Sequence, residues 1–206
     1  RPLSAVGIWP YLDKDQSPIL DIRISDGSSL MFLHFDQRDS GGKPMGYMVE
    51  NHSLRRAQYK RLLEAEDLIL YSPDSVVSID RSAHGVMAEL ASGTRLKARL
   101  LVGADGRGSR VRSEAGIGLT KWKYNQTGIV CVVRHDYHHN HIAQERFLPS
   151  GTFAILPLIG DPPEAGNRSS IVWTEVNELI PNIMNLSDLD FTGEICQRFG
   201  NFFGKR

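Results

Sequence analysis

The sequence has little cysteine and no excess of charge of either sign. Its 206 residues include only two cysteines, Cys131 and Cys196, and 24 basic residues balance 24 acidic ones. The two cysteines lie far apart and in no CxxC or Cys/His pattern, which argues against a zinc site or a disulfide scaffold and fits a reducing compartment. The balanced charge gives no overall field that would attract nucleic acid. We therefore expect a cytoplasmic protein with no metal site and no nucleic-acid partner.

Long apolar runs are also missing. No run approaches the ~20 residues that a membrane-spanning helix needs, and the first residues do not form a signal peptide. The chain begins without Met, at RPLSAVGIWP, as if in the middle of a domain. This beginning predicts an internal fragment of a longer protein.

Most elements that the sequence predicts are strands. Asp26-Gly27 is a strong hairpin signal between two alternating segments, and His84-Gly85 and Ser92-Gly93 punctuate a later meander. Apolar spacing predicts a helix capped by Ser53 and a second helix behind Ser187 or Asp188. The expected strands are residues 19–25, 30–35, 44–50, 76–80, 86–90, 95–101, 128–134, 145–148, 152–158 and 169–175, and the expected helices are residues 54–65 and a C-terminal stripe of Leu189, Phe191, Ile195, Phe199 and Phe202.

Residues 101–112, LVGADGRGSRVR, pass abruptly from apolar residues to glycines and then to basic residues. The apolar run Leu100–Val102 is typical of a strand buried on both faces, and glycines at a strand end let the backbone approach a ligand. Asp105 is expected either to accept hydrogen bonds from ribose hydroxyls or to hold neighbouring backbone amides. Ser109 is expected to cap a short helix, with Arg112 reaching back to Asp105. An ordinary structural turn remains an alternative, because the glycine spacing is not that of a pyrophosphate loop.

The stretch SGTRLKARLLVGADGRGSRVR (residues 92–112) resembles the second signature of the single-component FAD-dependent aromatic hydroxylases. Four further stretches resemble the ubiquinone-biosynthesis hydroxylases within that superfamily: GYMVEN (46–51), KWKYNQTGIVCVV (121–133), ERFLPSGTFAILPL (145–158) and SSIVWTE (169–175). The resemblance runs over most of the chain.

The resemblance implies an α+β fold with an α/β part: a large mixed β-sheet forms the substrate lobe, interleaved with a Rossmann-like FAD-binding lobe that is incomplete here. Residues 1–50 and 117–206 would belong to the substrate lobe, and residues 51–116 to part of the FAD lobe. Neither a Gly-x-Gly-x-x-Gly loop nor a Gly-Asp-Ala-Ala-His-like segment is present. Strands left without their neighbours would offer open edges for self-association.

The resemblance also implies the site residues and the chemistry. Asn51, Val76, Asp105, Gly106, Ser109 and Arg112 would bind FAD, and the last two would also serve NADPH. The implied reaction hydroxylates a prenylated phenol with NADPH and O₂, for ubiquinone biosynthesis. No catalytic side chain is assigned, because the cofactor carries the chemistry. A ubiquinone-biosynthesis complex and contact with a membrane surface are implied partners.

The sequence allows two interpretations for each of three groups of residues. The side chains of Phe153, Ile155 and Trp173 pack in the core or line an apolar substrate pocket. The histidines in HDYHHNH (His135, His138, His139 and His141) lie in a solvated loop, which we expect, or bind a metal. The C-terminal helix buries its stripe or touches a membrane. The whole chain has alternatives too: a non-catalytic binding module derived from the same fold, or a hydroxylase of another aromatic substrate.

Overall fold

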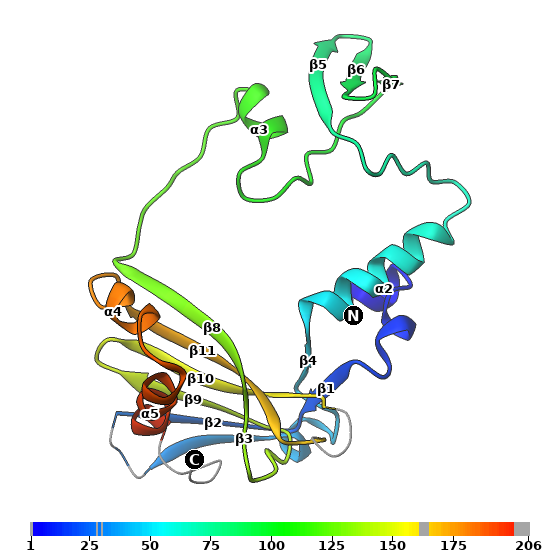
Figure 1. Ribbon diagram of the computed structural model, residues 1–206. Coiled ribbons are helices and arrows are strands. Elements are labelled where there is room, and N and C mark those ends of the chain that lie inside the picture. Colours follow the sequence, from blue (N-terminus) through cyan, green and yellow to red (C-terminus); the bar gives the residue numbers. More distant parts are fainter. Residues whose placement is uncertain (1, 28, 30, 161–164, 200–206) are drawn as a thin grey trace. The chain divides into compact units, whose positions relative to one another are not determined.

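The computed structural model describes residues 2–27, 29, 31–160 and 165–199 (Figure 1). The chain forms two compact units, one of residues 1–64 and 124–206 and one of residues 65–123. The first unit is therefore interrupted in sequence by the second. The domain boundaries expected at residues 50 and 116 separate functional lobes. The division into compact units does not test these functional boundaries, so they stay a prediction.

A six-stranded mixed sheet dominates the first unit (Figure 1). All its strand pairs are antiparallel except β2–β9, which is parallel. The strands, in spatial order, are β3 (Phe32–Asp36), β2 (Asp21–Asp26), β9 (Ile142–Leu148), β10 (Gly151–Leu158), β11 (Arg168–Val176) and β8 (Gln126–Arg134). The large mixed sheet and the β2–β3 hairpin at Asp26-Gly27 confirm the prediction; Leu30, at the predicted start of the second strand, lies outside the described residues.

Two C-terminal helices cover one face of this sheet, where alternate residues of β10 and β11 (Phe153 and Ile155, Ile171 and Trp173) present apolar side chains. The helices are α4 (Ile180–Met184) and α5 (Asp188–Phe199). Phe153 is the register partner of Trp173, and Ile155 that of Ile171. With Ile129 and Ile183, these residues form the buried core, against which Phe191 and Ile195 of α5 pack. Phe191 and Ile195 of the predicted stripe therefore pack against the core, whereas Leu189 is 80% exposed. The Phe199 side chain and Phe202 lie outside the described residues.

The helix starts follow local capping chemistry, with one correction. Ser187 Oγ accepts a hydrogen bond from the Asp190 backbone N–H at 3.2 Å, as a cap of α5 does. The earlier helix, α2 (Asn51–Leu63), begins before the expected cap. Its N-cap is Glu50, whose backbone is still extended, whereas Ser53 already lies inside the helix and is buried. The prediction that Ser53 caps this helix is wrong.

The rest of the first unit consists of short elements near its N-terminal part. Strands β1 (Gln16–Ile19) and β4 (Gly46–Val49) pair antiparallel as a separate two-stranded sheet. Around them lie α1 (Pro2–Ala5) and two 3₁₀ helices, η1 (Trp9–Leu12) and η2 (Gln37–Ser40). No helix formed by the described residues is long and apolar enough to cross a membrane.

The second unit holds a three-stranded antiparallel meander and one short helix. The strands are β5 (Val76–Ser82), β6 (Gly85–Leu90) and β7 (Arg95–Ala98), followed by α3 (Arg110–Glu114). The predicted meander is confirmed. The predicted buried strand at Leu100–Val102 is wrong: these residues form no strand, and Leu100 and Val102 are 75% and 71% exposed. A strand needs a neighbour for its backbone groups, and the described residues supply none there.

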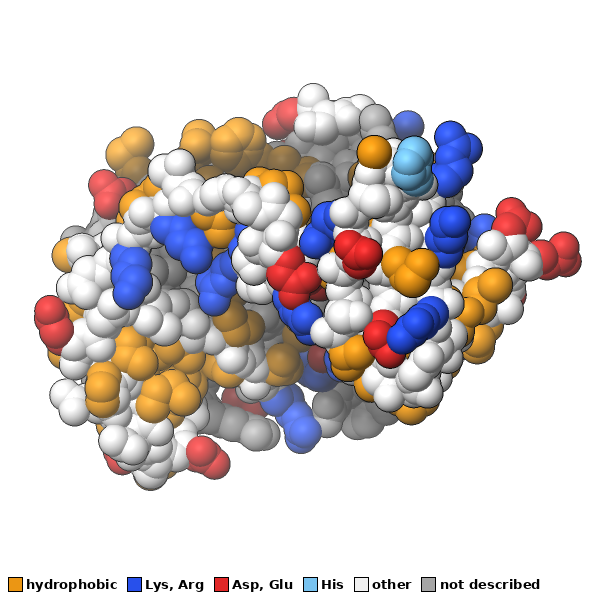
Figure 2. All heavy atoms as spheres, turned by 90° about the horizontal axis from the view of Figure 1, so that it is seen from above, with side chains coloured by type: hydrophobic (Ala, Val, Ile, Leu, Met, Phe, Trp, Pro, Cys, Tyr) orange, Lys and Arg blue, Asp and Glu red, His pale blue; other side chains and the backbone are white. Residues whose placement is uncertain are grey.

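The described part of the chain leaves many large apolar side chains at the surface. Figure 2 shows hydrophobic side chains spread among lysines and arginines. Ile69, Leu100, Val102 and Trp122 are examples of exposed apolar residues, each more than two-thirds exposed. Exposed apolar surface of this extent is typical of sites that contact another protein segment or a ligand.

Candidate functional site at the GADG turn

Asp105 lies in the turn that precedes α3, as the sequence predicts, but the strand expected to lead into this turn is not formed. The side chain is exposed, and the turn closes at Gly106, whose φ of +84° is a backbone conformation that glycine adopts without strain. Gly103 allows close packing of the segment against α3, because a β-carbon there would lie 3.0 Å from the Val111 side chain. The backbone conformation at Gly106 and the close packing at Gly103 therefore explain why glycine occupies these two positions.

The Asp105 carboxylate organises the start of α3. One oxygen accepts a hydrogen bond from Ser109 Oγ at 2.5 Å, and the other accepts from the backbone N–H groups of Arg110 at 2.8 Å and Val111 at 3.3 Å. These bonds, the one from Ser109 first, lower the pKa of Asp105 below its ordinary value. Of the two roles expected for Asp105, holding backbone amides is the one seen in the structure. A contact with a ribose stays a prediction.

Ser109 is the cap that the sequence predicts. Its hydroxyl accepts a hydrogen bond from the Arg112 backbone N–H at 3.0 Å, and the side chain is buried. The predicted pair between Arg112 and Asp105 is wrong. The Arg112 guanidinium donates instead to the Arg107 carbonyl at 3.2 Å, because Ser109, Arg110 and Val111 already occupy the carboxylate.

Arg110 is a residue that the sequence analysis missed. Its guanidinium donates to the carbonyls of Val76 at 3.1 Å and Val77 at 2.8 Å, and it pairs with Glu114 one helical turn on. The helix is thereby tied to the start of β5. Val76, which is expected to bind FAD, accepts this hydrogen bond from Arg110 with its backbone carbonyl. In the sequence, the i, i+4 spacing of Arg110 and Glu114 indicates an ion pair on a helix, and this signal could have drawn attention to Arg110.

A hollow of about 460 Å³ opens beside the turn, entirely within the second unit. Three arginines (Arg81, Arg99 and Arg112) line it together with Gly103 and Gly106. The remaining lining is mainly apolar: Val86, Leu100, Leu101, Val111, Ala115 and Ile117, with Ser109. Guanidinium groups and glycine backbone suit phosphate groups, and apolar walls suit an aromatic ring. The lining is therefore chemically suited to a group that carries phosphate and an aromatic ring, as a nucleotide does.

Comparison with known proteins also points to a flavoprotein hydroxylase family. No protein-family model matches the chain. The ubiquinone hydroxylase UbiL of Rhodospirillum rubrum is 46% identical over 204 residues, which cover 99% of this chain and 46% of that protein. The mitochondrial ubiquinone biosynthesis monooxygenase COQ6 of Danio rerio is 30% identical over 208 residues, 96% of this chain and 42% of that protein. The chain belongs to the ubiquinone hydroxylase family of FAD-dependent aromatic hydroxylases.

Solved structures agree with the fold. The crystal structure of P. aeruginosa PqsL in complex with 2-aminobenzoylacetate superimposes with a TM-score of 0.78 at 16% identity, over 95% of this chain and 53% of that one. At this identity the likeness concerns the fold alone. The chain spans about half the length of the curated ubiquinone hydroxylases that it matches.

Asn51, which is also expected to bind FAD, belongs to the first unit. It is the first residue of α2 and is exposed. Its side chain is therefore accessible to a ligand, and its role toward FAD stays a prediction.

The three residues expected either in the core or in a substrate pocket lie in the core. Phe153, Ile155 and Trp173 are at most 1% exposed and pack under α4 and α5. Side chains buried to this extent contact other side chains, not open space, which supports the core alternative. The opposite face of the six-stranded sheet, which carries Val130 and Val132, remains exposed.

The histidine segment is not the solvated loop that we expected. His135 and His139 are buried, and protein groups hold their rings: His135 Nε2 lies 2.9 Å from Ser169 Oγ, and His139 Nε2 lies 3.0 Å from the Leu158 carbonyl. Burial lowers the pKa of His139 to about 4. Hydrogen bonds to β10 and β11 therefore hold these two histidines inside the fold, whereas His138 is exposed.

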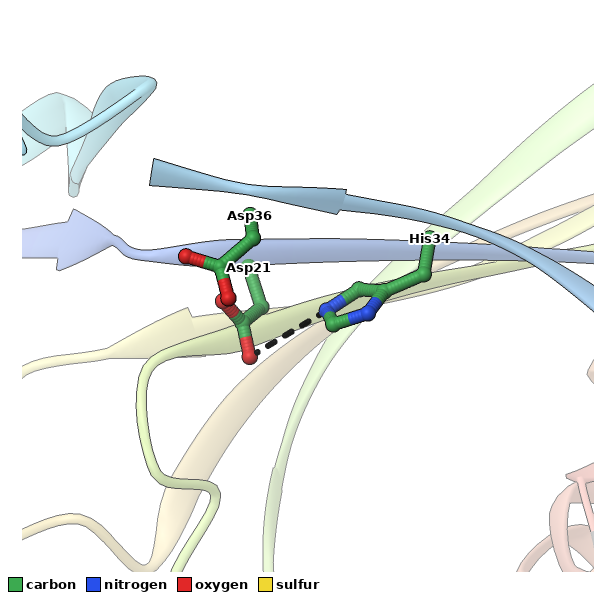
Figure 3. A group of neighbouring side chains, drawn as sticks. All are labelled: Asp21, His34 and Asp36. Atoms are coloured by element: carbon green, nitrogen blue, oxygen red, sulfur yellow. Dashed lines mark ion pairs between the residues drawn. The ribbon is translucent and has the colours of Figure 1, made fainter. Parts of the chain in front are cut away.

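A different group, Asp21, His34 and Asp36, brings metal-binding atom types within 4.8 Å of one another (Figure 3). Asp21 and Asp36 are register partners on β2 and β3, and His34 Nε2 lies 3.5 Å from Asp21 Oδ2. The Arg38 guanidinium and backbone N–H already bind the Asp36 carboxylate and lower its pKa to about 2. An arginine therefore compensates the negative charge of this group.

Proposed function

We propose that this chain is the central part of an FAD-dependent monooxygenase that hydroxylates a prenylated phenol in ubiquinone biosynthesis, with NAD(P)H and O₂ as co-substrates. The observation that carries the proposal is the 46% identity to a ubiquinone hydroxylase over nearly the whole chain, GADG turn included. FAD, when bound, supplies the oxygen-activating chemistry. NADPH, a biosynthetic complex, a cytoplasmic location and contact with a membrane surface belong to the same proposal.

The residues of this chain would contribute binding and orientation. Asp105 fixes the turn by its bonds to Ser109 and to two backbone amides, so that the Gly106 backbone is held in one conformation. Arg81, Arg99 and Arg112 would attract the phosphate groups of a dinucleotide to the adjoining hollow. The open face of the six-stranded sheet would receive the substrate, because the other face is filled by the core.

Substitution of Asp105 in the complete enzyme tests the proposal. Asp105→Ala removes the carboxylate that shapes the turn, and we expect FAD affinity to fall roughly tenfold to hundredfold, the effect of losing hydrogen bonds to a charged group. The measurement is flavin absorbance per purified protein, together with NADPH oxidation and hydroxylated product.

Asp80→Ala is the matched control, since Asp80 is an exposed carboxylate on β5 in the same unit. It should leave flavin content unchanged. A fully flavin-loaded Asp105→Ala enzyme with normal NADPH oxidation would refute the role of the turn. A wild-type enzyme that binds neither FAD nor a phenol would instead favour a non-catalytic binding module, and turnover of a different aromatic compound would correct the substrate.

A further inference from the structure

The six-stranded sheet has one filled face and one open face. On the edge strand β8, Val130 and Val132 are 67% and 50% exposed, while their neighbour Ile129 is buried in the core. At the opposite edge, Leu33 and Phe35 of β3 are 58% and 42% exposed. Side chains alternate between the faces of a strand, so these four residues belong to the face that α4 and α5 do not cover.

One cross-strand row on this open face follows directly from the register of the strands. Leu33 pairs with Ile24, Ile24 with Glu145, and Glu145 with Ala154. The row continues from Ala154 to Val172 and from Val172 to Val130. It therefore contains five apolar residues and one carboxylate, on the inner strand β9.

Glu145 has no structural partner in the part of the chain that the structure describes: no hydrogen bond or ion pair involves its carboxylate. The neighbouring residues of its own strand, Gln144 and Arg146, point to the other face, and Arg146 donates to the carbonyls of Gly27 and Arg198. A carboxylate among apolar side chains is unfavourable once water is excluded, unless a hydrogen-bond donor meets it. Burying this face under a ligand therefore requires a ligand that brings such a donor.

We propose that Glu145 accepts a hydrogen bond from the hydroxyl group of a phenolic substrate that lies on the open face, with the apolar row beneath its ring and prenyl chain. This inference rests on the proposed function and names the residue that determines specificity. A carboxylate is an acceptor only, so it selects a hydroxyl donor and rejects an ether. The row crosses six strands and is roughly 24 Å long, enough for a ring with several isoprene units.

The test measures binding in the complete, FAD-loaded enzyme, with 2-geranylphenol and its methyl ether as probes. Dissociation constants are read from the change in flavin absorbance when each probe binds. We expect the wild-type enzyme to bind the phenol roughly tenfold to hundredfold more tightly than the ether, because a buried carboxylate left without a donor is penalised. Glu145→Leu should bind both probes within about twofold of each other.

Glu145→Gln keeps the shape of the side chain and a carbonyl acceptor, so it should retain part of the preference for the phenol over the ether. This variant also serves as a control if Glu145→Leu fails to fold. Glu66→Gln, at an exposed carboxylate of the other unit, should leave the preference unchanged. If Glu145→Leu keeps the wild-type preference, the assignment of Glu145 is wrong while the proposed function stands. If the wild-type enzyme binds and hydroxylates no phenol, the proposed function fails, and this inference with it.

Discussion

Removing Arg198 should cost the first unit a large part of its stability. Its guanidinium lies 3.5 Å from the Glu175 carboxylate, which is 1% exposed, and 4.0 Å from the centre of the Trp173 ring. Glu175 also accepts hydrogen bonds from Ser150 Oγ at 3.1 Å and from the Val176 backbone N–H at 3.0 Å. Arg198 is therefore the cation that compensates a buried charge beneath α5.

Breaking a buried ion pair from one side typically costs 3–5 kcal/mol, and the hydrogen bonds that remain on Glu175 place Arg198→Leu near the lower end, at about 3 kcal/mol. Loss of the cation–π contact adds about 1 kcal/mol. We therefore expect the free energy of unfolding to fall by about 3–4 kcal/mol, measured by urea denaturation with tryptophan fluorescence.

Two further variants separate the buried charge from other effects. Adding Glu175→Leu to Arg198→Leu should recover most of the stability, since a buried pair replaced by apolar residues is often neutral. Glu194→Gln, which removes the partly exposed helical partner of Arg198, should cost about 0.5 kcal/mol or less. An Arg198→Leu protein within about 1 kcal/mol of wild type would refute the reasoning.

Two other predictions concern the chain itself. Residues 1–206 alone should bind FAD poorly and show no hydroxylase turnover, because no Gly-x-Gly-x-x-Gly loop offers amides to the pyrophosphate. They should also self-associate through β3 and β8, the edge strands of the described sheet. Flavin-fluorescence titration and sedimentation check this, and stoichiometric micromolar FAD binding by a monomer would contradict it. The second prediction concerns pH. Because burial lowers the pKa of His139 to about 4, the unfolded chain binds more protons than the folded chain below about pH 6.5. The free energy of unfolding should therefore fall by on the order of 3 kcal/mol as the pH falls from about 6.5 to 4. Urea midpoints across this range measure the loss, His139→Phe should flatten the profile, and an unchanged wild-type midpoint at low pH would count against it.

The sequence by itself determined the elements whose signals are local. Asp26-Gly27 set the β2–β3 hairpin, His84-Gly85 and Ser92-Gly93 set the meander, and Ser109 and Ser187 set two helix starts. A turn or a cap depends on a few adjacent residues, and the side-chain chemistry that forms it is visible in the sequence.

Only the tertiary structure decided which residues meet across long separations. The parallel pairing of β2 with β9, the choice of partner for Arg112 and the burial of His139 could not be read from spacing. Alternation showed that the sheet has two faces, but the position of α5 decided that Trp173 is core and that Glu145 lies on the open face. The physical reason is that burial and strand pairing depend on neighbours distant in sequence, and a local pattern predicts a strand without naming its neighbours.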